Sequence, residues 1–260
     1  MSASVDDFSR VEAGASRLSG PRNALILVVG LVLLWQVTYL WVGESALASP
    51  LETVGYLGKL FASETFWPHV RDTTKAFLAA YALAVVLGLA FGFWFGFRRF
   101  AGEVAEPMVV AIYSLPKVTL YPILLLAFGL GISAKIAFGT LHGVIPIILF
   151  TLAAVRNVRP IFVKTGRVLK LPPWAMVRTV LFPAALPEIF TGLRVGFSLT
   201  LIGTLLAEMF ASQRGLGFLL MNGIGLHNVP QIMAVTLLVV VFAAGVSTVL
   251  LVIDRRLHRG

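Results

Sequence analysis

Apolar residues run along this chain in long blocks that are separated by shorter polar or basic stretches. A helix that crosses the hydrocarbon core of a bilayer needs about 20 consecutive, mainly apolar residues. Six blocks meet that requirement, and they predict six transmembrane helices. The six cover about residues 24–42, 73–97, 106–128, 134–154, 188–211 and 230–253. The pattern therefore predicts an all-α polytopic membrane protein.

Positive charge is unevenly placed between the predicted spans. If all six spans are real, fourteen Lys and Arg residues fall on one side of the membrane, and that side is expected to be cytoplasmic. The fourteen are Arg10, Arg17, Arg22, Arg98, Arg99, Arg156, Arg159, Lys164, Arg167, Lys170, Arg178, Arg255, Arg256 and Arg259. The outer side receives Lys59, Arg71, Lys75, Lys135 and Arg214. We therefore expect both termini to be cytoplasmic, with residues 1–21 as a cytoplasmic tail without the apolar core of a signal peptide.

Composition supports the prediction of a membrane protein and excludes some other functions. Of 260 residues, 58% are hydrophobic and only 13% are charged, whereas soluble domains are about one quarter charged. The formal net charge of +9 would suggest a nucleic-acid partner in a soluble protein. Here the cytoplasmic bias of Lys and Arg accounts for it, so no nucleic acid is expected. The chain has no cysteine, which excludes disulfides and thiol chemistry.

Two further helical features follow from local spacing. Apolar residues three and four apart in the outer segment 43–72 predict a short amphipathic helix, with Ser49 as its N-cap and Pro50 at its first position. Gly88, Gly92 and Gly96 share one face of the second span. That face would allow close contact with another helix, in the same bundle or across a dimer, although glycine is also simply common in membrane helices.

The cytoplasmic segment of about residues 156–187 is longer than a helix hairpin needs, and it is basic, partly apolar and rich in proline. Pro172 and Pro173 are expected to end one short helix and begin a second, from Trp174 to Phe182. Such a segment can lie on lipid headgroups as an interfacial helix, or it can dock a cytoplasmic partner. The residues alone leave both possibilities open.

The spacing of this loop resembles the motif E-A-A-x3-G-x9-I-x-L-P of the permease subunits of binding-protein-dependent ABC importers. Lys164 stands at the Glu position, Thr165 and Gly166 at the two Ala positions, and Lys170 at the Gly position. Pro183 is identical to the motif. Residues 182–194 (FPAALPEIFTGLR) and 207–218 (AEMFASQRGLGF) also resemble the nitrate, taurine, aliphatic-sulfonate and pyrimidine-precursor permeases.

This resemblance implies a six-helix permease of the type I, MetI-like fold, in which residues 22–260 form the transmembrane domain of a bacterial inner-membrane protein. It also implies a homodimer, two separate ATPase subunits and a periplasmic substrate-binding protein. ATP and Mg would be bound by the ATPases, and no cofactor is expected in this chain. Coupling to the ATPase would fall to Lys164, Thr165, Gly166, Arg167, Lys170 and Pro183. Because Lys164 reverses the charge of the motif's Glu, the partner surface is expected to be acidic.

Charged groups inside predicted spans are costly and are usually functional or paired. Lys117, His142 and Glu208 are therefore candidates for the translocation pathway or a gate. The alternative is bundle packing or extension to a headgroup for Lys117 and interior packing for His142. Glu208 could instead hold the outer gate or the docking site of the binding protein. Arg194 and Glu208 are fourteen residues apart, about 21 Å along a helix, so they are not expected to pair within one chain. Arg194 would instead pack in the bundle or extend to a headgroup.

No nucleotide-binding G-x4-G-K-[ST] motif and no catalytic constellation is present in the sequence, so we do not expect an enzyme. The leading hypothesis is the permease subunit of an ATP-driven importer of a small solute, such as a sulfonate, taurine or nitrate. A secondary carrier or channel is the alternative, and it would be expected to hold acidic or polar ion-coupling residues at mid-span. The sequence does not name the cargo.

Overall fold

The computed structural model describes residues 21–257, without the side chains of residues 21, 22, 163, 167, 173, 211 and 257. The predicted tail of residues 1–21 therefore lies outside the described residues, except for Pro21. All secondary-structure elements of the described residues are helices. In chain order these are α2 (Pro21–Val42), α3 (Pro50–Ala62), α4 (Phe66–Phe97), α5 (Arg99–Ser114), η2 (Lys117–Leu120), α6 (Tyr121–Phe128), α7 (Ile132–Arg156), α8 (Pro160–Val168), α9 (Pro173–Met176), η3 (Val177–Leu181), α10 (Phe182–Ala211), α11 (Leu216–Gly225) and α12 (Val229–Leu257).

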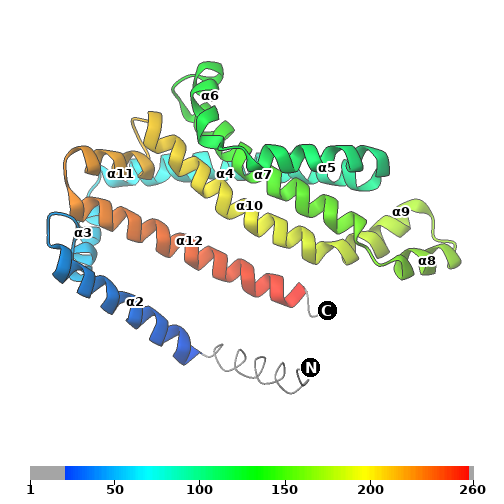
Figure 1. Ribbon diagram of the computed structural model, residues 1–260, viewed down its shortest axis with the longest axis horizontal. Coiled ribbons are helices and arrows are strands. Elements are labelled where there is room, and N and C mark those ends of the chain that lie inside the picture. The colour runs from blue at the N-terminus through cyan, green and yellow to red at the C-terminus, as the bar shows by residue number, and fades with distance from the viewer. Residues whose placement is uncertain (1–20, 258–260) are drawn as a thin grey trace, which may run out of the picture.

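Three long helices, α4, α7 and α10, form the centre of an elongated bundle (Figure 1). Small residues allow their backbones to approach. A Cβ atom added at Gly88 would lie 2.5 Å from Cγ2 of Ile147, and one at Gly92 would lie 2.5 Å from Cβ of Thr151. On the other side of α7, a Cβ at Gly196 of α10 would lie 2.6 Å from Cγ1 of Ile147. The central helix is thus packed between two glycine-bearing faces.

The prediction of six membrane-crossing segments is confirmed, with one of them bent. Among the described residues, five helices are long and apolar enough to span a bilayer, and α5 with η2–α6 forms a sixth segment that bends by 88°. The prediction of one continuous helix over residues 106–128 is therefore wrong, because this span is broken into α5 and η2–α6. Leu115 is extended, with φ −67° and ψ 141°, because the ring of Pro116 disfavours a helical conformation in the residue before it.

The amphipathic helix of the outer segment is confirmed as α3. The hydroxyl of Ser49 accepts a hydrogen bond of 3.2 Å from the backbone N–H of Glu52, and Pro50 occupies the first turn. The helix packs against the start of α12, where the amide nitrogen of Asn228 donates to the hydroxyl of Tyr56 at 3.0 Å. A surface helix and a spanning helix are thereby joined at one end of the bundle.

The segment that enters the fifth span differs from the prediction of a separate short helix ending at Phe182. The helix that begins with α9 continues without a break through η3 into α10. Pro183 has no N–H to offer and would crowd the preceding turn of an α-helix. Residues Val177–Leu181 adopt a π-helical turn instead, and such a turn absorbs an irregularity within a continuous helix. Pro187 lies farther along, inside α10.

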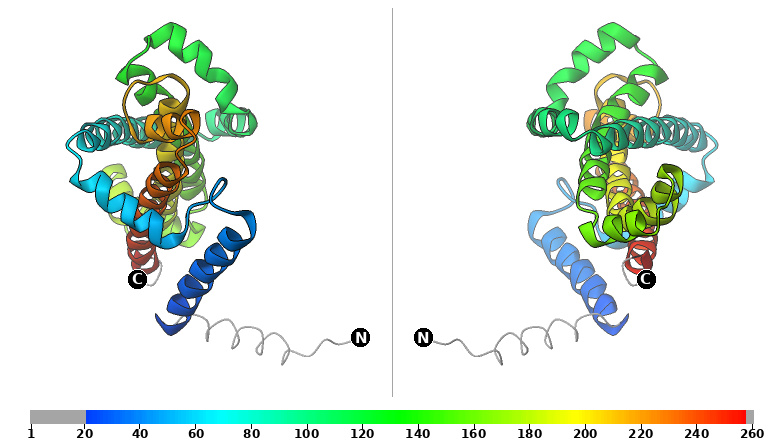
Figure 2. Two further views of the ribbon diagram at one scale, coloured as in Figure 1. Left: turned by 90° about the vertical axis from the view of Figure 1, so that its left-hand side faces the viewer. Right: turned by 90° about the vertical axis from the view of Figure 1, so that its right-hand side faces the viewer.

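Helix α2 lies apart from the central bundle in both views of Figure 2. Its apolar window is 0% buried within the chain, and so is that of α12. The indole N–H of Trp35 ties α2 to the connection that follows it by donating to the carbonyl of Ala48 at 3.0 Å. Two spanning helices thus present apolar surface that lipid or another protein must cover.

Candidate functional site

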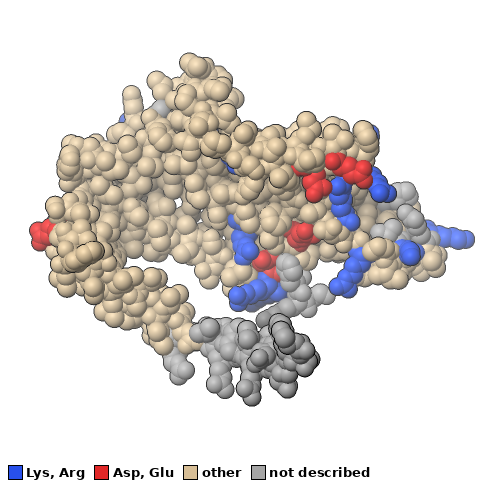
Figure 3. Space-filling view, in the orientation of Figure 1, with Lys and Arg blue, Asp and Glu red and all other residues tan. Residues whose placement is uncertain are grey.

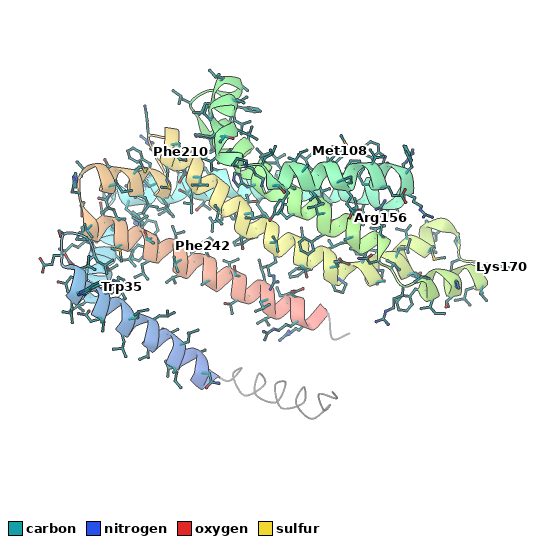
Figure 4. The ribbon with its side chains drawn as sticks, viewed as in Figure 1. Trp35, Met108, Arg156, Lys170, Phe210 and Phe242 are labelled. Atoms are coloured by element: carbon teal, nitrogen blue, oxygen red, sulfur yellow. The ribbon has the colours of Figure 1, made fainter. Side chains whose placement is uncertain are left out.

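The helix pair α8–α9 projects beyond one end of the bundle, and Lys170 lies at its tip (Figure 4). Lys164 and Thr165 are exposed on α8, whereas Gly166 is buried. A Cβ at Gly166 would lie 2.5 Å from Sδ of Met176, so a side chain here would displace the end of the Met176 side chain. The side chain of Arg167 lies outside the described residues. The small residue at position 166 therefore leaves room for Met176 of α9 to pack on α8.

A left-handed turn ends α8. Lys170 has φ +52°, and the N–H of Leu171 donates to the carbonyl of Gly166 at 3.1 Å. This is the 6→1 bond of a Schellman C-cap, in which the residue at C′ takes the left-handed conformation that glycine adopts most readily. Lys170 occupies the Gly position of the E-A-A-x3-G motif. The backbone here has a conformation that a glycine would adopt readily, although the residue is a lysine.

The surface of this projecting tip is both apolar and basic. Five large apolar side chains are exposed by 43% to 79% of their area: Ile161, Phe162, Val168, Leu169 and Trp174. The stretch from Arg156 to Pro187 has no acidic residue, and in Figure 3 Lys and Arg gather toward this end of the molecule. Exposed apolar side chains grouped among cations indicate a contact surface rather than a solvated loop.

A shallow apolar groove runs between α8 and the start of α10. It has a volume of about 310 Å³ and is lined by Phe162, Leu169, Val180 and Pro183, among others. Pro183 is exposed at this position. The residues that the motif singles out, from 164 to 183, are therefore brought onto one projecting unit.

At the opposite end, Glu208 lies at the centre of a buried polar cluster. Its side chain is 0% exposed. Oε2 accepts from the hydroxyl of Thr73 at 2.7 Å and from the N–H of Gly217 at 3.1 Å, and Oε1 lies 3.5 Å from Nζ of Lys135. The cluster joins α4, α7, α10 and α11. Because the carboxylate is fully buried, it does not face a surface that a soluble protein could contact.

Lys117 and His142 occupy different environments. Lys117 lies at the bend of the third span, where Nζ donates to the carbonyl of Tyr113 at 3.0 Å and lies 4.6 Å from the centre of the Tyr113 ring. His142 is buried in the centre of α7, with Nδ1 2.9 Å from the carbonyl of Phe138. Gly203 of α10 packs directly on the imidazole. Of the two, Lys117 is the one that remains accessible.

Arg194 pairs with a residue of the last helix. Its Nη1 lies 3.7 Å from Oδ2 of Asp254, whose Oδ1 accepts from the hydroxyl of Thr191 at 3.2 Å. An open hollow of about 550 Å³ lies beside this pair, and Tyr113, Ser198 and Thr248 contribute to its lining. The ion pair links α10 to α12 at the end of the bundle that carries α8 and α9.

Comparison with known families decides the identity of this arrangement. The family described as "Binding-protein-dependent transport system inner membrane component" matches residues 84–260. The chain belongs to this family. The match includes the projecting tip, the pair of Arg194 with Asp254, and Lys135, Glu208 and Gly217 of the buried cluster.

Relatives of this permease have different stated cargoes. It is 30% identical over 214 residues to the riboflavin transport system permease protein RibX of Chloroflexus aurantiacus, covering 80% of each chain. It is 28% identical over 162 residues to the taurine transport system permease protein TauC of Escherichia coli, covering 62% of this chain and 59% of that protein.

A solved structure shares the fold of this permease. The crystal structure of an amino acid ABC transporter with histidines superimposes with a TM-score of 0.60 over 80% of this chain and 99% of that one, at 18% identity. At that identity the likeness concerns the fold alone. The expected type I permease fold is thereby confirmed.

Sequence reasoning missed the partners of the charged residues in this permease. Lys135 was assigned to the outer side by its position alone, yet it pairs with Glu208. Nothing in the local sequence marks Asp254, near the end of α12, as the partner of Arg194. In both cases the two residues lie more than fifty positions apart, so no spacing rule could have joined them. The presence of a costly charge in a span was the available sign that a partner exists.

Proposed function

We propose that this permease is the translocating subunit of an ATP-driven importer, with energy supplied by separate ATPase subunits that bind ATP and Mg. A second copy of the chain and a periplasmic binding protein would complete the complex. The observation that supports this best is the projecting α8–α9 unit. Its exposed apolar and basic surface extends beyond the bundle, in the spacing of the family's coupling motif.

The proposed mechanism is mechanical. ATPase closure would move the α8–α9 unit, and the continuous helix from α9 through α10 would carry that movement into the bundle as hinge or shear motion. The unit suits this role because Gly166 packs on Met176 and a C-cap closes the turn at Lys170. A compact joint of this kind would transmit force from the ATPase to α10. Residues Lys164, Thr165, Gly166, Arg167, Lys170 and Pro183 would form or support the contact with the ATPase.

We further propose a small anion, such as a sulfonate, taurine or nitrate, as the cargo. The relation to the taurine permease supports this class, and the accessible Lys117 at the bend of the third span is the residue best placed to meet an anion in a pathway. The buried positions of His142 and Glu208 give them packing roles in this conformation. The relation to the riboflavin permease makes a direct ligand test necessary. Thermal-shift screening of the partner binding protein with taurine, nitrate and riboflavin would identify the class.

Coupling can be tested at Lys164. In a complex purified with its ATPase, Lys164→Glu is expected to weaken assembly or to reduce cargo-stimulated ATP hydrolysis about tenfold, because two like charges would meet where opposite charges met before. Lys164→Gln, which removes the charge without reversing it, is the matched control and should lose less. Normal assembly and normal coupling in the Lys164→Glu variant would count against an acidic partner surface.

The rival hypothesis of a secondary carrier makes a separate prediction. The purified permease, reconstituted into vesicles by itself, should not accumulate taurine or nitrate against a gradient, with or without an ion gradient. Uphill accumulation by the lone chain would overturn the proposed function.

A further inference from the structure

Basic residues are scarce at the end of the bundle opposite α8 and α9, yet three of them converge. Lys75 on α4, Lys135 on α7 and Arg214 after α10 line one hollow of about 580 Å³, together with Asp72 and Gln213. These positions are 60 to 139 residues apart in sequence. The hollow forms where the start of α7 and the end of α10, which carries Phe210 in Figure 4, meet beside α4.

The charges around this hollow are only partly compensated. Lys135 pairs with the buried Glu208 and also donates to the carbonyl of Arg214 at 2.7 Å. Asp72 lies 3.8 Å from the guanidinium of its neighbour Arg71. Within residues 21–257, no ion pair is formed by Lys75 or Arg214, and both are exposed. The hollow therefore carries a net positive charge on its rim.

We propose that this hollow is an anion-capture site at the outer mouth of the permease, with Lys75 and Arg214 as its binding residues. An ammonium and a guanidinium that line the same cleft suit a small oxyanion such as a sulfonate. A concave, positively charged site attracts such an anion, here on the face where the periplasmic binding protein of the proposed complex would release it. This inference rests on the proposed function in taking this end as the outer face and the cargo as an anion.

Lys135 positions the site but does not bind the anion. The residue is only 7% exposed, and its ammonium is held between Glu208 and the backbone of Arg214. It thereby fixes the 212–216 turn that carries Arg214, and it acts as a positioning residue. Its positive charge is offset by Glu208, so the capture of an anion depends on Lys75 and Arg214.

The absence of cysteine from the chain allows a direct measurement of the local potential. A Gln213→Cys variant places one thiol in the hollow, and Ser45→Cys places one on an exposed turn elsewhere. Each full-length chain, in lipid nanodiscs, is treated with a methanethiosulfonate reagent that carries a sulfonate and, separately, with one that carries a quaternary ammonium. Relative to Ser45→Cys, the thiol of Gln213→Cys should prefer the sulfonate reagent by about fivefold or more, as expected for unit charges at close range.

Charge removal then identifies the residues responsible. Added to Gln213→Cys, Lys75→Gln and Arg214→Gln should each reduce the preference about threefold or more, and together they should abolish it. Lys59→Gln, which removes an exposed lysine on α3 outside the hollow, should leave the preference unchanged. A preference that survives the double change, or that falls equally with Lys59→Gln, would overturn the assignment.

Occupancy is tested with methanesulfonate. At matched ionic strength with chloride, it should slow labelling of Gln213→Cys at least threefold and leave Ser45→Cys unaffected. Equal labelling rates in the two salts would show that the hollow attracts anions but does not bind them, which would overturn the site. Because labelling needs neither ATP nor transport, failure of the importer hypothesis and failure of this site appear in different assays.

Discussion

At the scale of single residues, the caps and turns of helices depend on neighbouring residues. The environment of each buried charge depends on a partner far away in the sequence. Ser49 as the N-cap and Pro50 in the first turn of α3 are predicted by the sequence and confirmed by the structure. The prediction succeeds because the capping bond joins residues only three apart, Ser49 and Glu52. Lys170 was placed in the coupling motif by spacing. Only the backbone shows that it adopts a left-handed conformation, which glycine adopts most readily.

Lys170 should therefore be replaceable by glycine with a gain in stability. A left-handed conformation costs a residue with a Cβ roughly 1 kcal/mol or more, and glycine avoids most of that cost. Lys170→Gly is expected to raise the thermal midpoint of the detergent-purified chain relative to Lys170→Ala, which removes the charge and keeps the Cβ. If the alanine variant is as stable as the glycine variant, the turn does not have this conformation in solution.

The pair of Lys135 and Glu208 is expected to behave as one unit. Removing one partner of a buried ion pair costs about 3–5 kcal/mol, whereas replacing both with apolar residues is often much less costly. Lys135→Met and Glu208→Leu should each lower thermal stability strongly, and the double variant should recover much of the loss. A double-mutant cycle in unfolding measures that coupling. Losses that simply add would contradict a direct interaction.

At the scale of helices, packing decides what periodicity leaves open. The glycine face of the second span allowed a contact in the bundle or across a dimer. The structure places Gly88, Gly92 and Gly96 against Ile147, Thr151 and Val155 of α7. The proline-rich segments were harder to predict. Pro116 bends a span by 88°, whereas Pro183 is absorbed into a continuous helix by a π-turn.

The contact between α4 and α7 can be tested with a single methyl group. Gly92→Ala would place its Cβ 2.5 Å from Cβ of Thr151, and overpacking of this kind typically costs about 1–3 kcal/mol. Gly245→Ala in α12 is the matched control, because a Cβ there meets nothing within 4 Å. In thermal unfolding, Gly92→Ala should be clearly less stable and Gly245→Ala unchanged or slightly more stable. Equal behaviour would argue against this packing.

At the scale of the whole molecule, the distribution of charge predicts how the bundle sits in the membrane. The basic end with α8 and α9 should face the cytoplasm, and the end with α3 and α11 should face outward. In intact cells, a membrane-impermeant maleimide should label Ser45→Cys directly. Val168→Cys should be labelled only after the membrane is permeabilised. Labelling of Val168→Cys from outside would reverse the proposed orientation.

Much of the fold can be predicted from the sequence because it depends on local properties of consecutive residues. Each span follows from the apolar content of about 20 consecutive residues, and the coupling loop follows from spacing within thirty residues. The environments of the pathway candidates could not be predicted from the sequence. Lys117 is accessible, whereas His142 and Glu208 are buried, and exposure depends on which helices come together.

The sequence by itself determined that this protein crosses a membrane several times, where its short basic helices lie, and which permease family it resembles. Those properties depend on segment hydrophobicity and short-range spacing. Only the tertiary structure decided that Lys135 neutralises Glu208, that Arg194 meets Asp254, and that Lys75 and Arg214 share one hollow. Charge partners across a bundle are set by helix packing, and no pattern within a single helix records which residues of another will face it.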